Sequence, residues 1–168
     1  GFAIKAALER AGVAPEEVEH VIMGQVLTAG QGQVPSRQAA SKGGIPMNVP
    51  SININKVCLS GLNSIYLANQ MIMSGEADIV IAGGMESMTN APYILKKHRS
   101  GARIGHDTAY DHMFLDGLED AYEPGRAMGT FAQETANEYQ LTREDQDNYS
   151  IESLRRAQEA ISSGAFVS

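Results

Sequence analysis

Apolar residues recur with two different periods along residues 1–87, and these periods predict alternating helices and strands. Residues 2–11 carry a helical pattern, and Gly12 is the expected helix end. The predicted apolar side of this helix holds Phe2, Ile4, Ala7, Leu8 and Ala11. Further helices are predicted over residues 36–42 and 58–73, and strands over residues 18–23, 51–55 and 77–82. Strands separated by helices indicate an α/β fold with a parallel sheet.

Glycine marks the predicted ends of several elements. Residues 26–34 are rich in Gly and Gln and are expected to form a loop. Gly43–Gly44 closes a helix, and Gly83–Gly84 is expected to stop the strand over residues 77–82. That Gly pair also begins a possible phosphate-binding loop, but its spacing fits neither common phosphate motif, so a tight turn is favoured.

The pattern changes over residues 88–168. Residues 90–105 have no sustained period and are expected to form a loop, and residues 110–118 include a short helix. A helix is predicted over residues 128–139 and a longer one over residues 142–163. Thr142 is the expected N-cap of the longer helix, with Asp145 three residues on.

Composition describes an acidic, globular protein. The 168 residues have a net charge of −7 and are 43% hydrophobic and 20% charged, which disfavours disorder and broad nucleic-acid binding. The uncharged run over residues 57–75 contains several Ser, Asn and Gln residues, so it predicts a buried helix and not a membrane span. Residues 1–87 contain two aromatic residues and residues 88–168 contain eight, which predicts a boundary near residues 88–92.

Cys58 is the strongest candidate for chemistry. It is the only cysteine, so a disulfide framework and a multi-cysteine zinc site are excluded for these residues. The thiol lies where a strand passes into a helix, and the amides of a helix start favour the thiolate and hold a developing oxyanion. The small residues Ser60 and Gly61 let a substrate approach. The alternative is an inert, buried cysteine.

Two other clusters have simpler explanations. His106, Asp107, Asp111 and His112 are possible metal ligands, but their spacing fits no common site, and no metal is expected. Lys96, Lys97, Arg99 and Arg103 form a basic stretch that suits an anionic ligand or partner, although a solvated loop is the more ordinary explanation.

Several motifs in this chain resemble those of thiolases. The run from Asn55 to Ile65 is similar to the family's Asn-x-x-Cys-x-Ser-Gly acyl-enzyme motif, and residues 83–92 resemble its Gly-Gly-Met-Glu-Ser-Met stretch. Shorter matches follow in family order: Gly30-x-Gly32, Arg37-Gln38-Ala39, Asp116-Gly117-Leu118, Met128-Gly129 and Glu144-x-Gln146-Asp147. The acetyl-CoA acetyltransferase branch is the most similar.

The resemblance implies a layered αβαβα thiolase fold and an acyl-transfer mechanism. Residues 1–87 would form the first α/β core without its opening strand, and residues 88–168 would begin the loop domain that covers CoA. Cys58 would carry the acyl group, with its backbone N–H as an oxyanion donor, and Leu118 and Met128 would line the pantetheine channel. Acetyl-CoA or another acyl-CoA would be the substrate, with no permanently bound cofactor.

The sequence also departs from the family pattern. Ala127 replaces a common His and Gln133 a common Glu, which leaves the preferred acyl chain open. Neither Gly-His-Pro nor Cys-x-Gly-Gly-Gly is present, so a C-terminal half is expected to be absent and the fragment inactive alone. The whole protein is expected to be a cytoplasmic homodimer or homotetramer in fatty acid metabolism, without nucleic-acid or membrane partners. A ketosynthase-like condensing enzyme and a non-catalytic CoA-binding or assembly module remain alternatives.

Overall fold

The structure has two compact units, which are described separately. The computed structural model describes residues 1–167, and the units are Gly1–Ala121 and Tyr122–Ser168. The predicted domains 1–87 and 88–168 concern the organisation of the whole protein and stay a prediction.

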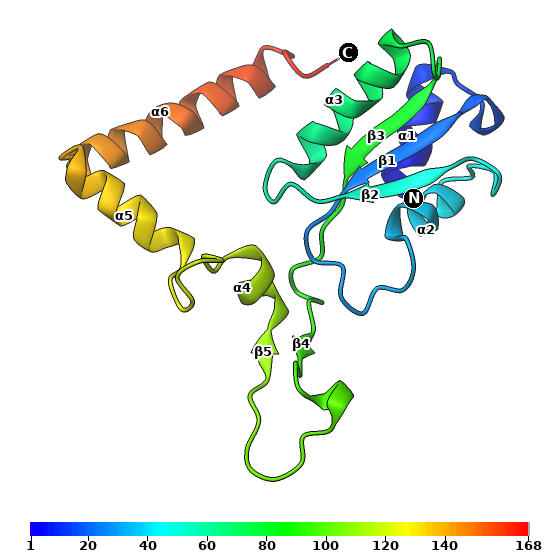
Figure 1. Ribbon diagram of the computed structural model, residues 1–168. Helices are drawn as coiled ribbons and strands as arrows, with labels where there is room; N and C mark the ends of the chain where they lie inside the picture. Colours follow the sequence, from blue (N-terminus) through cyan, green and yellow to red (C-terminus); the bar gives the residue numbers. More distant parts are fainter. Residues whose placement is uncertain (168) are drawn as a thin grey trace. The chain divides into compact units, whose positions relative to one another are not determined.

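A three-stranded parallel sheet organises the first unit (Figure 1). Its spatial order is β2 (Ser51–Ile54), β1 (His20–Gly24) and β3 (Val80–Gly84). The central strand β1 pairs Gly24 with Ile54 on one side and with Gly84 on the other, so the three strands end at one edge. The expected α/β fold with a parallel sheet is confirmed.

Helices cover both faces of this sheet. On one face, α1 (Phe2–Ala11) and α2 (Pro35–Lys42) enclose the main apolar core with the odd-numbered residues of β1. On the other face lies α3 (Ser60–Met73), opposite the even-numbered residues of β1 (Figure 1). Alternate side chains of β1 therefore point to opposite faces of the sheet, one towards α1 and α2 and the other towards α3.

The predicted helix at the N-terminus is confirmed, but three residues of its predicted apolar side are exposed. Ile4 and Leu8 are buried in the core, whereas Ala7 and Ala11 are exposed and the Phe2 side chain is 96% exposed. Gly12 ends the helix with a φ of 65°, which suits a residue without a Cβ atom. A short 3₁₀ turn, η1, follows at Pro15–Glu17.

Strand β3 begins three residues later and ends two residues later than the sequence pattern indicates. Gly83 and Gly84 do not stop the strand, because they pair with Met23 and Gly24 of β1. Glycine usually weakens a strand, but it also lets another backbone segment approach closely. Here that segment is the start of α3. The predicted helix over residues 58–73 likewise begins at Ser60, two residues after Cys58.

Residues 90–118 are more ordered than the sequence predicts. Strands β4 (Tyr93–Ile94) and β5 (Tyr110–Asp111) form a short antiparallel ribbon, and a 3₁₀ turn, η2 (His98–Ser100), lies between them. Helix α4 (His112–Gly117) follows β5 and is capped by the Asp111 side chain, which accepts a hydrogen bond from the Met113 N–H. Strands of two residues are too short to leave a period in the sequence.

The second unit consists mainly of α5 (Met128–Glu138) and α6 (Arg143–Ser162). Thr142 caps α6 as predicted: its hydroxyl accepts from the Asp145 N–H, and the Asp145 carboxylate accepts from the Thr142 N–H. The Thr142 hydroxyl also donates to this carboxylate, and this bond together with the one from the Thr142 N–H lowers the pKa of Asp145. Across residues 1–167, no helix has the length and apolar character needed to cross a membrane.

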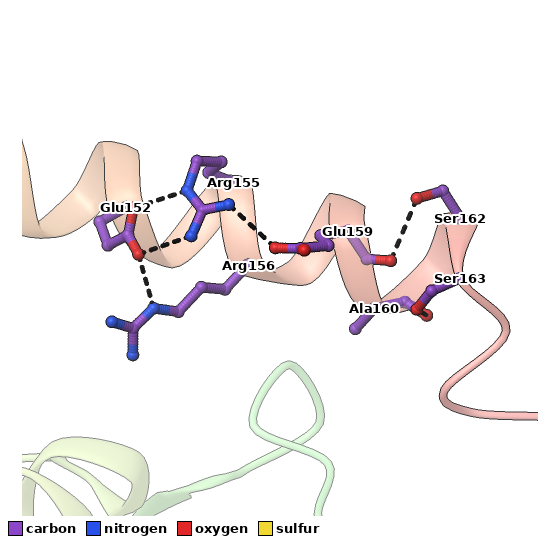
Figure 2. Close-up of polar contacts among 7 residues, drawn as sticks. All are labelled: Glu152, Arg155, Arg156, Glu159, Ala160, Ser162 and Ser163. Carbon is purple, nitrogen blue, oxygen red and sulfur yellow. Dashed lines mark hydrogen bonds and ion pairs between the residues drawn. The ribbon is translucent and has the colours of Figure 1, made fainter.

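Further along α6, the Glu152 carboxylate is shared by two arginine side chains. Glu152 accepts hydrogen bonds from Arg155 and Arg156, and Arg155 also donates to Glu159 (Figure 2). These spacings of three and four residues place the partners on adjacent turns. The hydrogen bonds from Arg155 and Arg156 lower the pKa of Glu152 to about 2.

We expect the two arginines to keep Glu152 ionised in acid. A pKa that is lower in the folded state means that this interaction is fully present above about pH 4.5 and is lost as the pH falls towards 2. Carbon-13 NMR of the Glu152 carboxyl should show a midpoint near 2, rising towards 4.5 in an Arg155→Ala/Arg156→Ala variant. Arg143→Ala, which removes the partner of Asp147, is the control. An unchanged midpoint in the double variant would contradict the assignment.

Candidate active site

Two polar side chains shape the turn between β2 and α3. The Asn55 side-chain oxygen accepts a hydrogen bond from the Val57 N–H at 2.9 Å. The Ser60 hydroxyl accepts from the Lys56 N–H at 2.8 Å and donates to the Val57 carbonyl at 2.6 Å. Asn and Ser are residues that commonly bond to nearby backbone in this way. The turn is thus closed by its own sequence.

These bonds hold Val57 in an unusual backbone conformation. Its φ is 49°, in the left-handed region that a β-branched residue rarely occupies. Such a conformation costs of order 1–3 kcal/mol and persists only where the surroundings impose it. Here both the N–H and the carbonyl of Val57 are bonded to fixed side chains. The next residue, Cys58, is exposed with a free thiol, so the burial that the alternative expects is not found in this chain.

Three glycines bring the start of α3 against the sheet. A Cβ atom on Gly24, at the end of β1, would lie within 2.6 Å of backbone atoms of Ser60 and Gly61. A Cβ on Gly84 would lie 3.3 Å from the Gly61 Cα. Backbone therefore packs on backbone at this point, which explains the glycines at the ends of β1 and β3.

Buried serines complete this contact. The Ser64 side chain is fully buried, and its hydroxyl donates to the Gly83 carbonyl at 2.8 Å. Ser60 is also buried. The small size of Ser60 and Gly61 thus serves the packing of α3 on the sheet. Both residues also line the cavity beside Cys58, and their part in admitting a substrate stays a prediction.

Glu86 fixes the loop after β1, which lines the same cavity as the turn that carries Cys58. Its two carboxylate oxygens accept hydrogen bonds from the Val26 and Leu27 N–H groups, both at 2.9 Å. A carboxylate that accepts two backbone donors fixes a loop with the strength of charge-assisted hydrogen bonds. Sequence reasoning found Glu86 only as part of a motif and missed this function, because its partners lie sixty residues away.

A cavity of about 420 Å³ adjoins the Cys58 turn within the first unit. Its walls come from the end of β1, the turn before α3, the segment after β3 and helix α4. Most side chains on it are apolar, including Leu27, Val57, Met85, Met88, Met113 and Leu118. The predicted residues Cys58 and Leu118 both line it, and no histidine of the described residues does.

The remaining candidates are placed differently. Met128 is the first residue of α5, in the second unit. The residues considered as metal ligands have separate partners: Asp107 pairs with His98 at 3.0 Å, Asp111 caps α4, and His112 pairs with Asp116 at 2.5 Å. In the basic stretch, the Lys96 ammonium lies 4.2 Å from the centre of the Tyr110 ring.

Comparison with known proteins gives matches along the entire chain. The family model "Thiolase, N-terminal domain" matches residues 1–168. An acetyl-CoA acetyltransferase from Cupriavidus necator is 53% identical over 163 residues. Probable acetyl-CoA acetyltransferases from Escherichia coli and Mycolicibacterium smegmatis are each 48% identical. These matches cover 97–98% of this chain but only 41–42% of the relatives.

The close contact at Gly24 predicts that adding a single methyl group there lowers the free energy of unfolding strongly. Gly24→Ala should destabilise the first unit by about 1–3 kcal/mol or more, because backbone cannot move aside as a side chain would. Denaturant unfolding of the native protein measures this change. Gly129→Ala is the matched control, since no atom lies within 4 Å of the added Cβ in the described residues. Equal stability of the two variants would refute the close approach.

Proposed function

The chain belongs to the thiolase family, matching its N-terminal domain, and on this premise we propose that Cys58 is the nucleophile of thiolase-type acyl transfer. The Cys58 sulfur attacks the carbonyl carbon of an acyl-CoA thioester, and CoA leaves as its thiol with the proton from Cys58. The α-carbon of a second acyl-CoA, after giving a proton to a general base, then attacks the acyl carbonyl carbon. The bond from this carbon to the Cys58 sulfur breaks, the sulfur regains a proton, and the product is a 3-ketoacyl-CoA. The reverse reaction cleaves a 3-ketoacyl-CoA with CoA.

The observation that carries the proposal is the presentation of the Cys58 thiol. An exposed thiol follows a residue held in a strained conformation, lies two residues before α3, and borders an apolar cavity. The partial positive charge of the helix start favours the tetrahedral oxyanion, for which the Cys58 N–H is the proposed donor. An apolar wall excludes water that would otherwise hydrolyse the acyl-enzyme.

The finer assignments are part of the same proposal. Leu118 and Met128 contact the pantetheine arm of acyl-CoA, and residues 88–168 begin the domain that covers it. CoA enters as substrate, so no permanently bound cofactor is required. The whole protein is proposed to act in the cytoplasm as a homodimer or homotetramer. The names of the relatives, acetyl-CoA acetyltransferases, support an acetyl group as the acyl unit.

These 168 residues by themselves are proposed to reach the acyl-enzyme at most. Carbon–carbon bond formation requires removal of a proton from the α-carbon of the second acyl-CoA, which needs a general base. The sequence contains neither of the family motifs that supply the catalytic His and the second Cys. The two chemical steps can therefore be tested separately.

Acetyl-CoA should transfer one acetyl group to Cys58 of the native protein. Intact mass before and after incubation, followed by peptide mapping, detects and locates this adduct. Cys58→Ala should abolish it and lower turnover by at least about 1,000-fold, since no other group takes the acyl unit. Met47→Ala, an exposed residue that does not line the cavity, should retain wild-type activity.

The outcomes separate this proposal from its alternatives. Tight binding of acetyl-CoA without an adduct on Cys58 would refute acyl transfer and support a CoA-binding module. Condensation with a malonyl thioester and not with acetyl-CoA would support a ketosynthase-like enzyme. Thiolysis by the pure 168-residue chain would overturn the proposed division of the two steps.

A further inference from the structure

His112 is a buried, titratable residue with no part in the proposed reaction. It is the first residue of α4 and is only 6% exposed. Its Nδ1 lies 2.5 Å from the Asp116 carboxylate one turn along the same helix. Its Nε2 accepts a hydrogen bond from the Ala29 N–H at 3.3 Å. Both nitrogens of this imidazole therefore have protein partners.

These partners define the form of the imidazole. The Ala29 N–H can only donate, so Nε2 must carry a lone pair. The ring proton then resides on Nδ1, where Asp116 accepts it. A proton on Nε2 would place two donors against each other. Ala29 and Asp116 thus fix the orientation of the ring and the position of its proton.

The Ala29 bond joins two segments that form one wall of the cavity. Leu27, two residues before Ala29, lines the cavity and is fixed by Glu86 through its N–H group. Met113 and Leu118 line the cavity from the side of α4. The two segments also touch closely, since a Cβ atom on Gly117 would lie 3.4 Å from the Leu27 side chain. The hydrogen bond from the Ala29 N–H to His112 ties the two segments together.

We propose that His112 is a positioning residue that holds Met113 and Leu118 against the loop after β1, and so sets the cavity beside Cys58 for an acyl-CoA chain. The inference rests on the proposed acyl transfer. His112 touches no reacting atom in this arrangement. Its effect reaches the substrate through Leu118 and the loop backbone, so it should act on binding in the ground state and the transition state equally.

Two polar variants of the native protein separate the two bonds of His112. In His112→Gln, the side-chain oxygen can still accept from Ala29, whereas the shorter side chain in His112→Asn reaches only towards Asp116. We expect His112→Asn to raise the KM for acetyl-CoA roughly tenfold, with kcat within about twofold, as for one lost buried hydrogen bond. His112→Gln should stay within about threefold of wild type.

His98→Gln is the matched control, because His98 also pairs with an aspartate but lies in the β4–β5 connection, away from the cavity lining. Its KM should be unchanged. A second readout does not depend on turnover: amide hydrogen exchange at Ala29, followed by mass spectrometry, should accelerate in His112→Asn and not in His112→Gln.

Each result bears on a different claim. If the wild-type protein forms no Cys58 adduct, the proposed function fails and this inference with it. If the adduct forms but His112→Asn leaves both the KM and the exchange at Ala29 unchanged, only the positioning role fails. Equal defects in the Gln and Asn variants, or a fall in kcat with unchanged KM, would also overturn it.

Discussion

The direct contact between the start of α3 and the ends of β1 and β3 is the constraint on which the site depends. Three backbone segments meet at Gly24, Gly61 and Gly84, where a Cβ atom on Gly24 would collide with backbone and one on Gly84 would be tightly confined. The helix start is thereby held at the edge of the sheet, and the preceding turn projects from it. Ser64 adds a hydrogen bond from within the same contact. The position of Cys58 is therefore set by packing, before any substrate is considered.

Around this contact, several polar groups fix the backbone. Asn55 and Ser60 close the turn that carries Cys58, Glu86 holds two amides of the opposite loop, and His112 holds a third. The cavity surface is left largely to leucine and methionine side chains. This division gives an apolar site with a rigid frame, which suits chemistry on a thioester.

The sequence alone predicted much of the fold, because long elements leave a period in their residues. The N-terminal helix, the parallel sheet and the capped α6 were all recognised, and the family motifs located Cys58. The errors have physical causes. Gly83–Gly84 was interpreted as a strand end, since nothing local shows that a helix packs there. The functions of Glu86 and His112 were missed because each depends on residues distant in the sequence.

The two sides of the cavity are encoded very differently along the chain. The turn that presents the thiol is contained in the six residues from Asn55 to Ser60. The facing wall draws on segments near Leu27, Glu86 and Leu118, spread over some ninety positions of the sequence. Evolution can therefore remodel the shape of the binding site through many small, separate changes while the reactive turn passes from parent to descendant as one unit.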